Sequence, residues 1–113
     1  FSSVVFTENN ANYHGGAVYL KGAATLVEHS CAYNTNTAGN GGDGGAVWLD
    51  EADYSSFGSS FVSNSAGNKG GGIFADGESN SPCYLTLESV TLQSNKQRSG
   101  GTTDWYGGGG LYL

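Results

Sequence analysis

The residues best suited to chemistry are two aspartates, Asp50 and Asp76, which each directly follow a copy of one short motif. If the copies stack in space, the two carboxylates lie side by side. They could then share a proton, bind calcium or act as acid and base on a polysaccharide. Lys21 holds the equivalent place after another copy, and the only arginine, Arg98, lies elsewhere. Because no third acid or arginine completes the set, a solvated turn is the favoured interpretation, and no catalytic residue is assigned.

The two histidines, His14 and His29, are isolated in the sequence. The place of His14 relative to its motif is taken by Asp43 and Lys69 in later copies. A position that accepts such different side chains is typical of a tolerant surface site rather than of a metal ligand.

The cysteine and glycine patterns do not predict a metal site either. Cys31 and Cys83 could pair or stay free, and their spacing from histidine does not resemble a zinc site. Cys31 is expected to be a small buried hydrophobe. Residues 39–44 resemble one calcium-binding nonapeptide repeat, but a single copy without recurrence is weak evidence. The sequence therefore predicts no metal and no cofactor.

Composition limits the class of protein. The 113 residues include 20 glycines and one proline, 12% are charged, 12% are aromatic, and the net charge is −6. A nucleic-acid partner is excluded, because binding to phosphates needs a basic surface. No stretch approaches the roughly 20 apolar residues of a membrane-spanning helix. Abundant glycine with β-branched and aromatic residues favours an all-β chain with many tight turns.

Two motifs alternate along the chain. The first reads Gly-Gly-small-aliphatic-aromatic-aliphatic, at residues 15–20, 44–49, 70–75 and 108–113. The second reads aromatic-x-x-Asn-x-Ala, at 6–11, 33–38 and 61–66, with a degenerate copy at 92–97. A weaker apolar segment precedes the second motif, at 25–27, at Tyr54 and at 84–87. A period of about 28 residues without a helical pattern predicts a β-solenoid with up to three short strands per coil.

Equivalent residues of a solenoid stack in columns along its axis, about 4.8 Å apart. Two aliphatic columns of the first motif, two residues apart and so on one face, are expected to form the core. The aromatic column of the second motif is expected to stack inside as well. Variable insertions are expected at the turns, at 96–107 and after Asp76. The aliphatic columns are Val18, Val47, Ile73, Leu111 and Leu20, Leu49, Ala75, Leu113, and the second-motif column is Phe6, Tyr33, Phe61, Leu92.

The aromatic residues of the first motif lie between the two aliphatic columns and should therefore face outward. An exposed row of aromatic side chains exceeds what a soluble monomer usually leaves in water. It could contact another chain or a sugar, or an insertion of the same chain could cover it. The predicted interaction ladder is Tyr19, Trp48, Phe74 and Tyr112.

The asparagines of the second motif form another column with a structural explanation. Asparagine satisfies backbone groups at turns and tolerates the left-handed conformation, and stacked amides can hydrogen-bond to one another. The predicted structural ladder is Asn9, Asn36, Asn64 and Asn95.

The alternation of Gly-Gly-Ala-aliphatic-aromatic with Phe-x-x-Asn-x-Ala resembles the polymorphic outer membrane protein repeat, named from chlamydial autotransporter adhesins. The resemblance covers essentially the whole chain, although Gly72, Gly110, Leu92 and Gln97 depart from the pattern. It implies a right-handed parallel β-helix displayed outside the cell. With about four coils and no polar cap, residues 1–113 are expected to be one β-helical segment of a longer protein.

The predicted function is that of a non-enzymatic extracellular or cell-surface scaffold, such as a stalk, coat, fibre subunit or adhesive module. Uncapped coils expose strand edges that template further pairing, so the expected partners are adjoining repeats or further copies of the chain. Two alternatives stay open: a glycan-binding module that uses the aromatic ladder, and a polysaccharide-cleaving enzyme of the pectin-lyase type.

Overall fold

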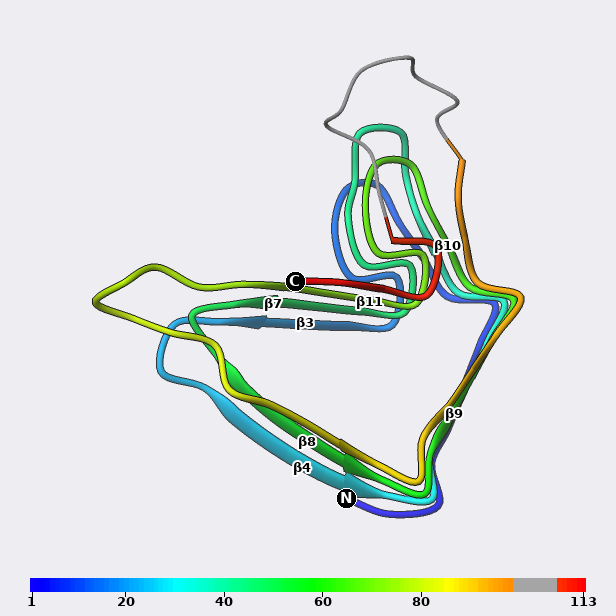
Figure 1. The fold of residues 1–113 in the computed structure, drawn as a ribbon. Coiled ribbons are helices and arrows are strands. Elements are labelled where there is room, and N and C mark those ends of the chain that lie inside the picture. Colours follow the sequence, from blue (N-terminus) through cyan, green and yellow to red (C-terminus); the bar gives the residue numbers. More distant parts are fainter. Residues whose placement is uncertain (99–107) are drawn as a thin grey trace.

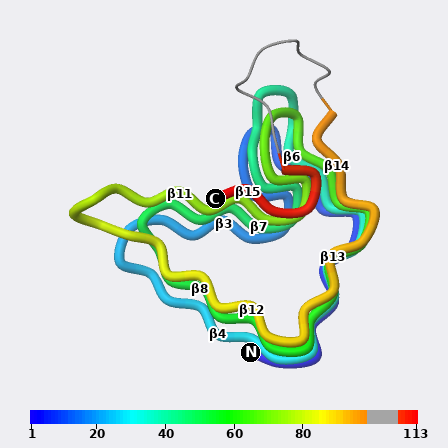
Figure 2. Tube along the Cα trace, viewed as in Figure 1, coloured from blue at the N-terminus to red at the C-terminus, as the bar shows by residue number. Residues whose placement is uncertain are grey.

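The computed structural model describes residues 1–98 and 108–113, which form an all-β solenoid (Figure 1). Each complete coil holds four short strands, and the chain traces a roughly triangular path with the coils stacked on one another (Figure 2). The strands of coil 1 are β1 (Val5–Thr7), β2 (Asn10–Ala11), β3 (Val18–Lys21) and β4 (Thr25–His29). Those of coil 2 are β5 (Ala32–Asn34), β6 (Thr37–Ala38), β7 (Val47–Asp50) and β8 (Asp53–Phe57).

Coil 3 repeats the order and coil 4 begins it again. Coil 3 holds β9 (Ser60–Val62), β10 (Ser65–Ala66), β11 (Ile73–Asp76) and β12 (Leu85–Glu88), and coil 4 holds β13 (Thr91–Gln93), β14 (Lys96–Gln97) and β15 (Leu111–Tyr112). All the ladders between these strands are parallel, in the sheets β1-β5-β9-β13, β2-β6-β10-β14, β3-β7-β11-β15 and β4-β8-β12. The predicted solenoid of about four coils is confirmed: the described residues form three full coils and three of the four strands of a fourth.

The predicted columns match the strand register. Phe6 pairs with Tyr33, Tyr33 with Phe61 and Phe61 with Leu92. In the first motif, Val47 lies between Val18 and Ile73. The periodicity of the sequence therefore predicts correctly which residues are neighbours along the solenoid axis.

The second motif forms two strands per coil, so each coil has four strands rather than the predicted three. A residue in the left-handed conformation turns the chain just before each motif asparagine, with φ between 53° and 56° at Glu8, Thr35, Ser63 and Ser94. The prediction that the asparagine itself tolerates this conformation is thus misplaced by one residue. The aromatic residue and the alanine of the motif consequently lie on different sides of a corner.

The glycine pair of the first motif has two separate functions. The first glycine makes a sharp turn with positive φ, as at Gly44, where φ is 67°. The second glycine, such as Gly45, has no room for a side chain, because a Cβ atom there would overlap the carbonyl oxygen of Gly71 in the next coil. The pair therefore allows both the turn and the close approach of successive coils.

The core lies inside the triangle and is best buried in coils 2 and 3, where Val47, Leu49, Phe61 and Ile73 have no exposed surface. Inward residues at both ends of the stack are only partly buried, although they pack against this core. These residues are Val4, Phe6, Val18, Leu20 and Leu26 in coil 1, and Leu85, Leu87, Val90 and Leu111 at the other end.

The insertion predicted after Asp76 is present, as the loop between β11 and β12 that protrudes at the left of Figure 1. The insertion predicted at 96–107 begins later than expected, because Lys96 and Gln97 form β14. Residues 99–107 lie outside the described part of the chain.

Candidate functional site

The aromatic residues of the first motif stack along the outer side of the sheet β3-β7-β11-β15. The ring centroids of Tyr19 and Trp48 are 4.4 Å apart, those of Trp48 and Phe74 are 6.2 Å apart, and those of Phe74 and Tyr112 are 5.5 Å apart. Because neighbouring rings face one another, only the rings at the two ends have an open face. A sugar therefore finds no flat aromatic platform along the middle of this column.

The expectation that the whole aromatic column is exposed is wrong for its two central members. Tyr19 is 51% exposed, but Trp48 and Phe74 are only 8% and 5% exposed, and Tyr112 is half-buried. The indole Nε1 of Trp48 is buried and has no hydrogen-bond partner among the described residues.

Two of the rings are contacted by the side loops, which are the segments 12–14, 39–43 and 67–69 between the second and third strands of coils 1 to 3. They protrude together at the top of Figure 1. The ring of His14 stacks on Trp48 at 5.0 Å, and Lys69 places its Nζ atom 4.7 Å from the ring centroid of Tyr112. Each of these side chains lies over the aromatic residue of the following coil.

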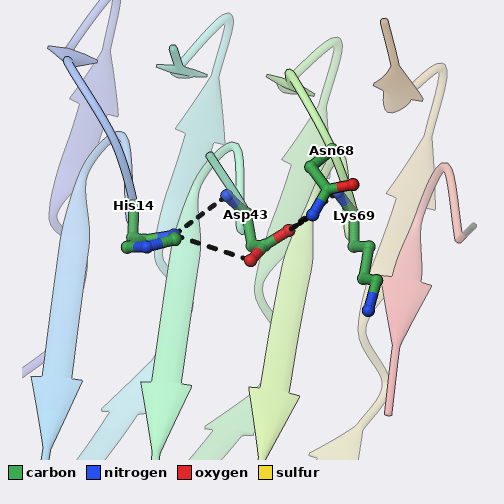
Figure 3. A network of polar contacts seen from close by, with 4 residues as sticks. All are labelled: His14, Asp43, Asn68 and Lys69. Carbon is green, nitrogen blue, oxygen red and sulfur yellow. Dashed lines mark hydrogen bonds and ion pairs between the residues drawn. The ribbon is translucent and has the colours of Figure 1, made fainter. Parts of the chain in front are cut away.

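One polar network joins the three side loops (Figure 3). The Oδ1 atom of Asp43 accepts hydrogen bonds from Asn68 Nδ2 at 2.8 Å and from the Lys69 amide at 3.0 Å. On its other side, the Asp43 amide donates to His14 Nδ1 at 3.1 Å, and Asp43 Oδ2 lies 3.6 Å from the same nitrogen.

This network corrects the prediction that His14, Asp43 and Lys69 share a tolerant surface position. Partial burial raises the pKa of Asp43, although His14 and the donors from Asn68 and Lys69 oppose that shift. The carboxylate holds neighbouring loops together. Among the described residues, no group of three histidine, cysteine or acidic side chains could hold a metal ion.

The charged column after the first motif joins Lys21, Asp50 and Asp76 in register, as the sequence predicts. Lys21 Nζ lies 3.0 Å from Asp50 Oδ2, and this interaction raises the pKa of the lysine. Asp76 is exposed. One of the two candidate carboxylates is thus paired with a lysine rather than directed at the other.

The motif asparagines lie one above another at the corner between two sheets. Asn36 donates from its backbone amide and from Nδ2 to Asn64 Oδ1, at 2.9 and 3.0 Å. The Nδ2 atom of Asn36 also donates to the carbonyl of Phe6 in the preceding coil, at 3.0 Å. Asn64 makes the same three bonds, to Asn95 Oδ1 and to the carbonyl of Tyr33. The amide groups therefore form a continuous ladder from Asn9 to Asn95.

A buried carboxylate was not anticipated from the sequence. Glu28 has no exposed surface and points into the core. It accepts hydrogen bonds from the hydroxyl groups of Tyr33, Tyr54 (2.6 Å) and Ser56 (2.8 Å). Burial and the contact with Glu28 raise the pKa of both tyrosines far above the ordinary value. The three donors replace the water that the carboxylate loses on folding.

Both cysteines are free, which answers a question that the sequence left open. Cys31 is buried in the core, as predicted, whereas Cys83 is only partly covered and donates to the carbonyl of Asp76 at 3.0 Å.

Comparison with known families finds a match over part of the chain. The model of the Chlamydia polymorphic membrane protein repeat matches residues 3–21 and 58–76, which confirms the resemblance carried by the two motifs. Each match spans the first three strands of a coil, in coils 1 and 3. The side loop of coil 2 is longer by two residues, 39–43 against 12–14 and 67–69. The search of curated proteins and of solved structures found no match. Within the described residues there is no helix of the length and apolarity needed to span a membrane.

Proposed function

We propose that this chain is a segment of a non-enzymatic extracellular or cell-surface β-helix that serves as a structural or adhesive scaffold. The observation that carries the proposal is the stacking of equivalent residues through every coil, in sheets that are all parallel. Repeating packing of this kind builds length and rigidity, and each coil needs only its neighbours.

The positions whose residue type recurs from coil to coil all have structural roles, which supports a scaffold. The asparagines, the glycine pairs and the inward aromatic residues all bond or pack from coil to coil. Asp50, the better placed of the two candidate catalytic acids, is held by Lys21. Asp50 and His14, which sequence analysis considered for chemistry, thus have structural partners in the solenoid, whereas Asp76 is exposed.

The family match supports a location at the cell surface, because the repeat takes its name from membrane proteins of Chlamydia. The expected partners of the proposed scaffold are adjoining repeats and further copies of the chain. The second candidate function is glycan binding, in which a sugar ring would stack on the exposed Tyr19 at the end of the aromatic column.

The location can be tested on intact source cells with antibodies raised against the exposed loop between β11 and β12. We expect labelling of intact cells and loss of the epitope after external protease treatment. Labelling that requires permeabilised cells would contradict the proposed location. A scaffold further predicts that the protein as isolated forms rods or fibres in electron micrographs, and compact particles would contradict that part.

A further inference from the structure

The turn between the third and fourth strands is much longer in coil 3 than in the coils before it. Residues 22–24 join β3 to β4 and residues 51–52 join β7 to β8, whereas residues 77–84 form the loop between β11 and β12. This loop protrudes at the left of Figures 1 and 2, and Glu78 and Ser81 pair within it through two backbone hydrogen bonds, at 3.1 and 3.0 Å. An insertion confined to one repeat of a solenoid often builds its binding face, which makes this loop a candidate.

The loop borders a cavity of about 250 Å³ on the side of the solenoid. The walls come from three successive coils: Ser81, Pro82 and Tyr84 of coil 3, Glu51 and Asp53 of coil 2, and residues 23–24 of coil 1. Binding sites for small molecules usually measure about 300–1,000 Å³. The cavity is below that range and is the right size for one long side chain.

The charged side chains that line the cavity are both carboxylates. Asp53 Oδ1 accepts a hydrogen bond from the Tyr84 amide at 3.2 Å, but Asp53 Oδ2 and the whole carboxylate of Glu51 have no partner among the described residues. Lys21 is not their counter-ion, because it pairs with Asp50 at 3.0 Å and does not line the cavity. Two unpaired carboxylates around one cavity attract a cation.

Tyr84 adds an aromatic surface beside these carboxylates. Its side chain is 66% exposed, and no other ring of the described residues stacks on it. An aromatic ring next to carboxylates binds cations, and a guanidinium fits better than an ammonium. The planar guanidinium can stack on the ring and still donate two parallel hydrogen bonds to a carboxylate. A neutral sugar would leave both negative charges uncompensated.

We propose that this cavity binds an arginine side chain of a partner protein, with the guanidinium held by Tyr84, Glu51 and Asp53. This inference rests on the proposed function, because it gives the adhesive form of the scaffold a partner: a protein with an exposed basic segment. Asp76 and Glu78, both exposed on coil 3, add negative charge near the cavity, and the chain carries a net charge of −6. Such a field attracts a basic partner before contact and weakens as salt is added.

The test is a titration of the ¹⁵N-labelled 113-residue chain with the peptide acetyl-Gly-Arg-Gly-amide, followed by NMR. We expect shifts of the amide signals of Glu51, Asp53 and Tyr84, with a millimolar dissociation constant, since exposed ion pairs and cation–π contacts each contribute little. Added salt should weaken binding. The citrulline analogue has the same shape without the charge and should leave these signals unchanged, and the lysine analogue should bind more weakly.

Three substitutions remove one contact each. Glu51→Gln and Asp53→Asn delete a charge at nearly constant size, and Asp53→Asn retains Oδ1 as the acceptor for the Tyr84 amide. Each should weaken binding roughly threefold, as should Tyr84→Ala. Glu88→Gln, an equal loss of charge at an exposed position of β12 outside the cavity, and Tyr13→Ala, at a similarly exposed tyrosine, are the matched controls. A dispersed spectrum shows that each variant is folded.

Four results would overturn the proposal: no shift around the cavity at the solubility limit of the arginine peptide, equal binding of the citrulline or lysine analogue, equal binding by the cavity variants and their controls, or shifts of the same signals by cellobiose and not by the peptide. None of them changes the labelling of intact cells, so this inference can fail while the proposed surface scaffold stands.

Discussion

The Tyr54 hydroxyl lies 2.6 Å from Glu28 Oε1, and this hydrogen bond joins coils 1 and 2 through the centre of the solenoid. Tyr33 donates to the other carboxylate oxygen of Glu28. A charge-bearing group in an apolar core is tolerated when its oxygens accept hydrogen bonds, and here two hydroxyl groups donate to Oε1 of Glu28 and one donates to Oε2.

Alkaline pH should unfold the protein through these tyrosines. The pKa of Tyr33 and of Tyr54 is raised on folding by burial and by Glu28, so above about pH 10 the folded state holds protons that the unfolded state has lost. The contribution of these two tyrosines to the free energy of unfolding should therefore be constant below that pH and fall as pH rises further, by about 1.4 kcal/mol per pH unit for each tyrosine. Urea titrations at several pH values measure the slope, and Tyr54→Phe should reduce it by about half. Equal slopes in the two proteins would refute this account.

Replacing Asn64 by alanine should destabilise the whole stack. Asn64 has no exposed surface, and the substitution leaves the Asn36 amide groups without their acceptor and the Tyr33 carbonyl without its donor. With about 1–3 kcal/mol for each buried group left unpaired, we expect a loss of about 3 kcal/mol or more in the free energy of unfolding. Chemical denaturation measures it, with Asn40→Ala as the exposed control. A loss as small as that of the control would mean that the ladder adds nothing to stability.

The glycines of the first motif should differ sharply in tolerance. A Cβ atom at Gly45 would overlap backbone atoms of Gly71 and Ser65, so Gly45→Ala should disrupt folding or cost several kcal/mol. A Cβ atom at Gly110 would instead lie 3.7 Å from the side chain of Leu92, in ordinary contact, and alanine stands at the equivalent positions 17 and 46. We expect Gly110→Ala to be neutral or slightly stabilising in thermal denaturation. Similar midpoints for the two variants would contradict the packing argument.

Asp43 should control the stability of the side loops rather than of the core. Asp43→Ala removes the acceptor for Asn68 Nδ2 and for the Lys69 amide, whereas Asp43→Asn retains one oxygen in place. Amide hydrogen exchange should accelerate at Lys69 and Gly44 in the alanine variant, by roughly tenfold, and less in the asparagine variant. Exchange in β7 and β11 should stay unchanged. Faster exchange in those strands as well would place Asp43 within the core folding unit.

The two thiols should react at different rates. Cys83 is partly exposed and Cys31 is buried, and neither is in a disulfide. A thiol reagent such as DTNB should label Cys83 readily in the native protein and both cysteines in denaturant. Cys83→Ser should remove the fast phase. Slow labelling of both thiols in the native state would show that Cys83 is better protected than its exposure implies.

The sequence predicted the columns because each position recurs with its residue type. An aliphatic residue occupies one position of three successive coils, as Val18, Val47 and Ile73, and aligning these residues gives the strand register. Glu28 carries no such signal, since Ser56 and Leu87 hold its place in the following coils. Its burial follows from a set of donors on other strands that periodicity does not describe.

The burial of Trp48 escaped prediction for a related reason. Alternation along β7 correctly places its side chain on the side opposite Val47 and Leu49. Alternation gives no information on the path of the side loops, which depends on tight glycine turns and on the polar contacts of Asp43. A residue on the outer side of a sheet can therefore be as well buried as one inside.

The gradient of burial from the central coils to the ends has a mechanical consequence. A pulling force applied to the two termini acts first on the partly buried outer coils, whose loss leaves the interior stack intact. Each coil that peels away would release roughly 90 Å of extended chain, from about 27 residues. Extension should then proceed as a series of similar steps, and a tether made of such coils would lengthen under load before it fails.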